Sequence, residues 1–247
     1  LLLPLLLAAC GQSEERKPHR QDDSSPLLWE IARADGTVEG WLLGTIHALP
    51  DDALWRTASI DDVIADADLL AVEIDTLEDS AEIAHAFAPL AFSSGQPPLL
   101  ARVPPEKRDQ LAALVSETTY GLDDFQRIES WGAALILAQA VESGAKSENG
   151  VDRALMRDFR ARRIVELEGA TRQFAAFDGL SESAQRAMLA AIVEEAQMDS
   201  ESRNRPVELY LAGNAEGLEQ LTAEGMLANP EIRMALLTRR NLDWVTR

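Results

Sequence analysis

The first apolar runs of the chain predict a β-hairpin. Residues 27–31 and 38–43 are short and apolar and carry aromatic side chains, and the Ala-Asp-Gly sequence at 34–36 between them is a turn signal. Strands joined by so short a connection pair in antiparallel fashion. The folded part of the chain is therefore expected to start with a two-stranded ribbon.

Two helix-and-strand units follow in the pattern. Residues 53–67 have apolar positions at helical spacing, and they lead into residues 68–75, which have the pattern of a buried strand. Residues 152–162 and 163–168 repeat this order of helix and strand. A strand, a helix and a strand in succession predict a parallel crossover.

Most of the remaining sequence has helical periodicity. Residues 77–145 are mostly helical in pattern and are broken by two Pro-Pro pairs, and residues 171–247 are helical to the end. The apolar stretch 133–141 is too short to span a bilayer and is expected to be a buried core helix. We predict an α/β fold, with α+β as the alternative, in which a mixed central sheet carries an N-terminal hairpin and a large helical insertion.

The N-terminal 25 residues differ from the rest. Residues 1–9 are almost wholly apolar and end in two alanines, as a partial signal peptide does. Cys10, the only cysteine, stands where a bacterial lipobox carries its acylated cysteine; the alternative is ordinary signal cleavage that leaves a free thiol. Residues 10–25 are polar and charged, as in a disordered tether. The predicted domain is residues 26–247.

These features predict an exported protein anchored at the bacterial cell envelope by lipid on Cys10. Several acyl chains hold a protein at a membrane without any transmembrane helix. We expect the domain to face the periplasm. The outer membrane is preferred over the inner one, because Gly11-Gln12 lacks the aspartate associated with inner-membrane retention.

The net charge, the single cysteine and the absence of several motifs exclude some functional classes. With 42 acidic and 23 basic residues the net charge is -19, which repels nucleic acid. We favour solubility over recognition of a cationic substrate as the reason for this acidity. A single cysteine allows neither an intrachain disulfide nor a cysteine-based zinc site. The serine-hydrolase elbow, the zincin motif, the P-loop and the dinucleotide fingerprint are absent from the sequence.

Polar side chains at the ends of the predicted strands are the candidates for chemistry. The first apolar segment runs into Gly44-Thr45-Ile46-His47, and two later strands end near Glu73 and Glu168. In α/β sheets, ligands bind at the carboxyl ends of strands. An imidazole beside carboxylates can hold a divalent metal or act as a general base. Taken on spacing alone, His47 is better explained as a hydrogen-bonded structural histidine.

Several ordered blocks of the sequence resemble the TraB/GumN-like family, which is similar to the TIKI and PrgY proteins. The resemblance covers nearly all of residues 27–247. The most specific block is the one that contains Gly44-Thr45-Ile46-His47. In chain order the blocks are residues 43–50, the acidic strand at 71–75, Gly-Val-Asp at 150–152, residues 165–168, and the Arg-Asn-x-x-Trp pattern that starts at Arg240.

The resemblance implies a fold like that of erythromycin esterase and ChaN proteins, with a metal-dependent hydrolase site. The family site uses two Gly-x-x-His motifs and a glutamate. His47 matches the first motif, and Glu168 and Glu73 match the acidic positions. The resemblance thus assigns His47 and Glu168 to a Mn, Co or Zn ion and assigns Glu168 and Glu73 to catalysis. The supporting residues it suggests are Gly44, Asp152, Arg240 and Asn241.

The chain departs from the family pattern at one point. The second Gly-x-x-His is not in the sequence, and neither His19 in the tether nor His85 in a helical segment replaces it. We therefore expect the domain to be incomplete at its C-terminal end and inactive without that motif. His85 is expected to be a packing or surface residue.

The acidic residues also have structural explanations. Glu73 and Glu168 can cap strand ends or pair with Arg163 or Arg172. Asp152 is favoured as the N-cap of its helix. In the same way, the Arg-Asn pair of the last helix can pin that helix to the sheet.

The functional expectation is a metal-dependent peptidase or related hydrolase that acts on a peptide or small-molecule substrate. The metal would lower the pKa of a bound water, and a glutamate would carry the proton. The alternative is a non-catalytic envelope lipoprotein that binds or sequesters a peptide or small ligand. The lack of a second histidine motif favours this alternative.

Overall fold

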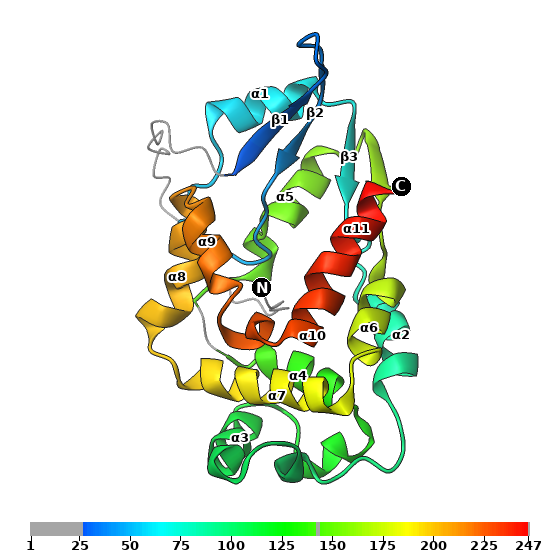
Figure 1. The fold of residues 1–247 in the computed structure, drawn as a ribbon, viewed down its shortest axis with the longest axis vertical. Helices are drawn as coiled ribbons and strands as arrows, with labels where there is room; N and C mark the ends of the chain where they lie inside the picture. The colour runs from blue at the N-terminus through cyan, green and yellow to red at the C-terminus, as the bar shows by residue number, and fades with distance from the viewer. Residues whose placement is uncertain (1–26, 142–143, 247) are drawn as a thin grey trace.

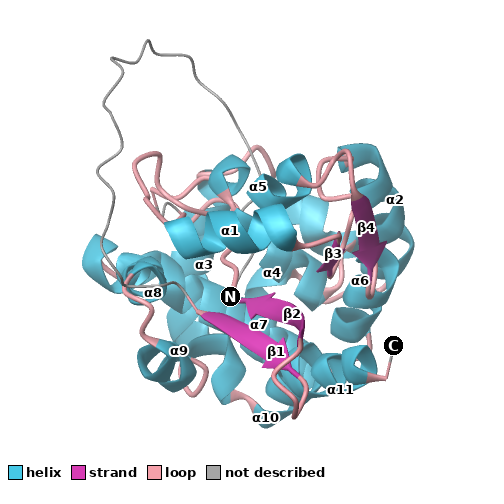
Figure 2. Ribbon diagram, turned by 90° about the horizontal axis from the view of Figure 1, so that it is seen from above, coloured by secondary structure: helices cyan, strands magenta, loops and turns pink. Residues whose placement is uncertain are grey.

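The computed structural model of the protein describes residues 27–141 and 144–246. They form a mixed α/β arrangement in which helices predominate (Figure 1). Two small sheets lie apart from each other, with helices around both (Figure 2). The mixed α/β class expected from the sequence is confirmed.

The hairpin predicted at the start of the domain is present. Strands β1 (Leu28–Ala32) and β2 (Val38–Leu43) pair in antiparallel fashion. In the turn, the side chain of Asp35 accepts a hydrogen bond from the N–H of Thr37. Because β2 runs directly into residues 44–47, the hairpin positions the Gly-x-x-His segment.

The second sheet is parallel and consists of strands that are far apart in the sequence. β3 (Leu69–Val72) pairs with β4 (Arg163–Glu166), with Val72 opposite Glu166 at the end of the register. The carboxyl ends of two parallel strands lie at the same edge of a sheet. The residues that follow β3 and β4, among them Glu73 and Glu168, are therefore neighbours.

The crossover predicted between β2 and β3 does not form a paired unit. Helix α1 (Ala58–Asp66) connects these strands, but among the described residues β2 pairs only with β1, and β3 only with β4. Two two-stranded sheets thus replace the single central sheet. The helix also starts later than residue 53, because the Thr57 side chain caps it by accepting a hydrogen bond from the N–H of Ile60.

Helices make up most of the rest, as the sequence predicted. No helix in the described part of the chain is long and apolar enough to cross a membrane. The helices are α2 (Ser80–Ala91), α3 (Arg108–Ser116), α4 (Ser130–Ala138), α5 (Val151–Asp158), α6 (Ala170–Asp178), α7 (Glu182–Gln197), α8 (Ser200–Leu211), α9 (Ala215–Leu221), α10 (Pro230–Arg233) and α11 (Arg239–Val245). Short 3-10 turns separate several of them, and a π turn, Met234–Thr238, joins α10 to α11.

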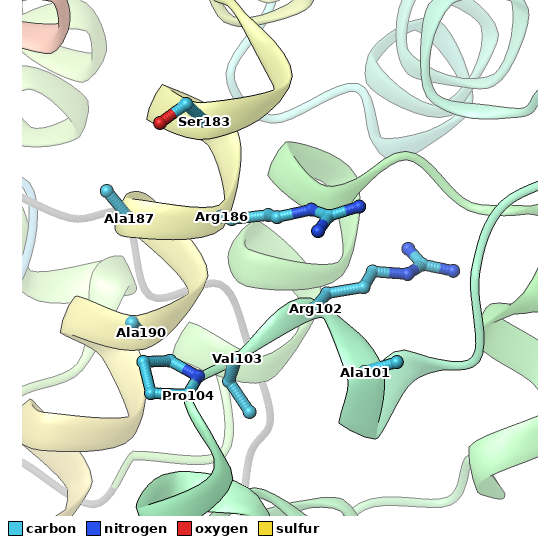
Figure 3. Close-up of a pocket in the computed structure, with 8 residues that line it drawn as sticks. All are labelled: Ala101, Arg102, Val103, Pro104, Ser183, Arg186, Ala187 and Ala190. Carbon is cyan, nitrogen blue, oxygen red and sulfur yellow. The ribbon is translucent and has the colours of Figure 1, made fainter.

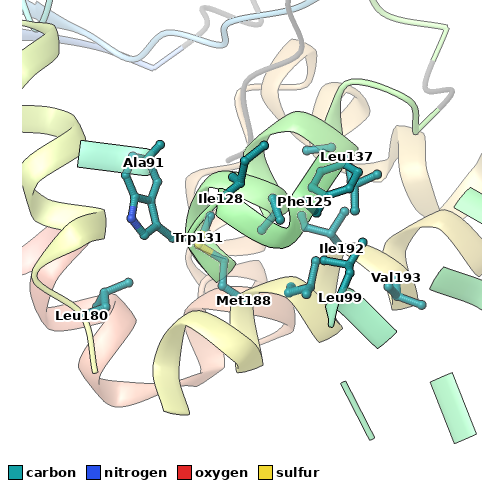
Figure 4. Packing of buried hydrophobic residues seen from close by; sticks show 14 of the residues in the cluster. Ala91, Leu99, Phe125, Ile128, Trp131, Leu137, Leu180, Met188, Ile192 and Val193 are labelled. Carbon is teal, nitrogen blue, oxygen red and sulfur yellow. The ribbon is translucent and has the colours of Figure 1, made fainter. Parts of the chain in front are cut away.

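The larger of two apolar cores lies among these helices. α4 packs against α7, and Trp131, Met188 and Ile192 between them are fully buried (Figure 4). The ring of Trp131 meets Phe87 edge-on and stacks on Phe177. The buried helix predicted from the apolar stretch at 133–141 is confirmed as α4. Removing such large side chains from water is the main stabilising contribution to this half of the molecule.

A smaller core lies between the hairpin and helices α1, α5 and α8. Its fully or nearly buried members include Ile46, Val151 and Tyr210. Ile46 precedes His47 in the sequence, and Val151 precedes Asp152. This core therefore supports the backbone segments that carry two of the candidate residues.

Candidate functional site

His47 and Asp152 form a direct pair. Nδ1 of His47 lies 2.6 Å from Oδ2 of Asp152, although the residues are 105 positions apart. The side chains are 26% and 16% exposed, respectively, so both are partly accessible to solvent. Nε2 of His47 has no hydrogen-bond partner within residues 27–141 and 144–246. One ring nitrogen is thus oriented by a carboxylate, and the other is available.

Close approach of two backbone segments assembles this pair. The N–H of Val151 donates to the carbonyl of Ile46 at 3.0 Å. Gly150 is packed so tightly that a Cβ there would overlap the carbonyl oxygen of His47, so only glycine permits the contact. The expectation that Asp152 is an N-cap is wrong. Gly150 holds the cap position of α5, and the carboxylate of Asp152 is engaged by His47 instead.

Electrostatics favour the charged forms of both partners. Burial by itself would lower the pKa of His47, but the hydrogen bond and negative charge of Asp152, aided by the charge of Glu73, outweigh burial and raise it. Burial would raise the pKa of Asp152, but the hydrogen bond and charge of His47, with a hydrogen bond from Thr45, lower it. Each charge thus stabilises the other. Outside the pair, the charge of Glu73 is the carboxylate charge that contributes to raising the pKa of His47.

Glu73 and Glu168 meet at Arg240 of α11. One guanidinium nitrogen donates to Glu73 at 2.6 Å and to Glu168 at 2.7 Å, and Nε donates to Glu168 at 2.8 Å. Gln173 donates to Glu73 at 3.2 Å. Glu168 is only 8% exposed, whereas Glu73 is 37% exposed. Burial would lower the pKa of Arg240, but the two carboxylates raise it.

These contacts decide between the structural explanations offered for the acidic residues. Glu73 and Glu168 pair with Arg240 and not with Arg163 or Arg172, since the last helix brings its guanidinium between the strand ends. The prediction that this helix is pinned to the sheet is confirmed for Arg240. Its neighbour Asn241 is exposed.

The described residues do not assemble a complete set of metal ligands. Between residues 27 and 246, leaving out 142 and 143, no three His, Cys, Asp or Glu side chains are grouped to hold a metal ion. Both oxygens of Glu168 accept hydrogen bonds from Arg240, and Nδ1 of His47 is bound to Asp152. Catalytic metal sites commonly use three protein ligands. The metal implied by the family resemblance therefore does not fit these residues by themselves.

Tyr210 of α8 is a neighbour of the site that no motif revealed. Its hydroxyl donates to the carbonyl of Gly44 at 2.9 Å, and the residue is 2% exposed. Gly44 itself packs against Leu27 with no room for a side chain. Helical spacing in the sequence predicts that such a tyrosine is buried, but it does not predict the partner of its hydroxyl. His85, by contrast, lies exposed on α2 and takes no part in the site.

A shallow depression of about 380 Å³ lies between α7 and the 3-10 turn Leu99–Arg102. The side chains of Arg102 and Arg186 extend side by side along it (Figure 3). Arg102 is buried and donates to three backbone carbonyls, and Arg186 pairs with Glu182. Because both arginines already have partners and no candidate residue lines the depression, it is not a candidate active site.

Together, the fold and the site define a mixed α/β domain with a histidine–aspartate pair and, at the ends of β3 and β4, a carboxylate–arginine cluster formed by Glu73, Glu168 and Arg240. The chain belongs to the TraB/PrgY/gumN family, whose model matches residues 27–247. The family suspected from the sequence blocks is thereby confirmed. No curated protein and no solved structure gives a significant match.

Proposed function

We propose that the protein is an envelope hydrolase that cleaves amide bonds in peptides, with His47 as its general base. The observation that carries the proposal is the 2.6 Å pairing of His47 with Asp152, which leaves Nε2 of a partly exposed imidazole without a partner among the described residues. A histidine oriented by a carboxylate is the usual arrangement for acid–base catalysis at neutral pH. Family membership supports the proposal but does not name a reaction.

In the proposed reaction, Nδ1–H of neutral His47 donates to Asp152, so that Nε2 is the basic nitrogen. Nε2 takes a proton from a water molecule as the water oxygen bonds to the carbonyl carbon of the substrate. The amide C–N bond then breaks, and His47 returns the proton to the leaving amine. Asp152 stabilises the imidazolium between these two steps. The products are a carboxylic acid, which keeps the second proton of the water, and an amine; proton exchange between them gives a carboxylate and an ammonium ion.

The residues of the carboxylate–arginine cluster have different roles in this proposal. Glu73 is the more exposed carboxylate and acts on His47 through its charge, so it is the one that would contact substrate. Glu168 is nearly buried and accepts three hydrogen bonds from Arg240. We assign Glu168 and Arg240 to holding Glu73 in place and not to contact with substrate.

Metal dependence is a separate part of the proposal. A Mn, Co or Zn ion would supply a Lewis acid that polarises the substrate carbonyl. Nε2 of His47 is the ligand atom that the predicted pair of His47 and Glu168 leaves available, and a metal bound there would take the place of the proton, so His47 would then be a ligand and not the general base. Since the described residues offer no three-ligand set, no step above uses a metal.

The direct test is peptide cleavage by protein produced from the complete natural reading frame. We expect His47→Ala to lower the rate by about 100-fold or more, since general-base catalysis contributes that much. His85→Ala is the matched control and should retain the wild-type rate, because His85 is exposed on α2. Each protein is assayed after chelation and after addition of Mn, Co or Zn. Equal cleavage by His47→Ala and wild type would remove His47 from the mechanism.

One observation favours the alternative of a non-catalytic binder of peptides or small ligands. Arg240 already pairs with both strand-end carboxylates, which makes them weaker candidates for metal binding or for base catalysis. Peptide binding measured by calorimetry separates the two functions. A protein that binds peptides through Glu73 but cleaves none of them, with or without metal, would favour the binder.

A further inference from the structure

We infer that Tyr210 is a positioning residue for the His47–Asp152 pair; its effect on rate rests on the proposed function. The Tyr210 hydroxyl reaches across 166 positions of sequence to donate to the Gly44 carbonyl at 2.9 Å. Gly44 is the first residue of the Gly-x-x-His segment. The bond therefore ties α8 to the start of the segment that carries His47.

Gly44 is restrained from two sides. Its N–H donates to the carbonyl of Leu27 at 2.7 Å, and its own carbonyl accepts from Tyr210. A Cβ at Gly44 would lie only 2.9 Å from Cβ of Leu27, so the backbone has no free space on that side. Loss of the Tyr210 hydroxyl removes one of these two restraints.

Only two residues separate Gly44 from His47, so the restraint acts on the imidazole over a short distance. The second of them, Ile46, is held by the N–H of Val151 and is buried in the same smaller core as Tyr210. Asp152 follows Val151 at the start of α5. Tyr210 and α5 therefore hold the same segment from different helices, and the 2.6 Å contact depends on both.

The phenol of Tyr210 is suited to serve as a permanent donor. Burial raises its pKa, and the nearby charge of Asp152 raises it further, so the hydroxyl keeps its proton. The ring fills space in the smaller core, whereas the hydroxyl alone makes the bond to Gly44. Tyr210→Phe thus removes the hydrogen bond and retains the packing.

The test compares Tyr210→Phe with Tyr120→Phe. Tyr120 is the other tyrosine of the chain and is 45% exposed. We expect Tyr210→Phe to lower kcat about tenfold or more with KM unchanged, because a small displacement of a catalytic group is costly in rate. Tyr120→Phe should match the wild type.

Proton NMR supplies a readout that does not need activity. We expect the proton in the short His47–Asp152 hydrogen bond to give a far-downfield resonance, which is assigned by its loss in His47→Ala. We expect this resonance to shift or broaden in Tyr210→Phe and to stay in place in Tyr120→Phe. Circular dichroism confirms that each variant is folded.

The outcomes separate this inference from the proposed function. An unchanged resonance in Tyr210→Phe overturns the inference whatever the rate, and so does a wild type without the resonance. Failure of Tyr210→Phe to fold also overturns it, since the hydroxyl would then be needed for the fold as a whole. A shifted resonance in a protein that cleaves no peptide supports the role of Tyr210 and counts against the hydrolase.

Discussion

At the scale of single residues, Asp152 sets the pH range in which His47 can accept a proton. The imidazole is a base only in its neutral form, and its pKa is raised above the ordinary value of about 6.5. The activity of the proposed hydrolase should therefore increase as the pH rises through the pKa of His47, at a pH above 6.5. Burial acts in the opposite direction and is outweighed by the aspartate.

Replacement of that aspartate has an expected effect of definite sign. In Asp152→Asn the negative charge is lost and burial remains, so the pKa of His47 should fall and the acid limb of kcat/KM should move to lower pH. The maximal rate should fall about 100-fold, because the tautomer of His47 is no longer fixed. Asp158→Asn is the control, since Asp158 lies on the same helix and pairs with Arg56. An acid limb that stays in place in Asp152→Asn would contradict this role.

Of the two residues in this pair, the sequence identifies His47 but not its partner. His47 is identifiable because its motif is local. Asp152 was assigned a capping role, since nothing local indicates that Gly150 allows the two segments to approach. The partner of a side chain depends on such long-range packing, which a single sequence does not contain.

At the scale of elements, helices and strands follow from local periodicity, but strand partners do not. The hairpin was predicted correctly because a short turn leaves β2 little choice of partner. In the described part of the chain four α-helices, α2 to α5, separate β3 from β4, and the apolar pattern of β3 fits any neighbour equally well. The predicted crossover from β2 to β3 was wrong for this reason.

Helix α11 is attached to the second sheet through Arg240, and this attachment has a measurable energy. Arg240→Ala leaves two neighbouring carboxylates without their cation, and Glu168 is nearly buried. We expect the free energy of unfolding to fall by about 3 kcal/mol, because an uncompensated buried charge is strongly destabilising. Urea denaturation measures this loss.

The control for this prediction is the adjacent residue. Arg239 lies on the same helix and is exposed, so Arg239→Ala should change stability by no more than about 0.5 kcal/mol. Equal stability of the two variants would show that the cluster does not fasten the helix.

At the scale of the whole molecule, the proposed envelope location depends on Cys10, which lies outside the described residues. We expect wild-type protein expressed in a bacterium to fractionate with membranes and to require detergent for release, and Cys10→Ser to be soluble. In this proposal acyl chains would supply the binding, since a protein of net charge -19 is repelled by anionic lipid. Resistance of the wild type to a high-salt wash is the control against ionic adsorption. Membrane retention of Cys10→Ser would contradict lipid anchoring.

The two apolar cores support different halves of the candidate site. Ile46 and Val151, next to the histidine and the aspartate, belong to the smaller core, whereas Ile74 and Leu236, near the carboxylate cluster, belong to the larger one. Evolution or protein engineering can therefore repack the surroundings of the base and of the carboxylates separately, while the charge of Glu73 still contributes to the pKa of His47. Changes in the packing of one half of the site need not alter the packing of the other.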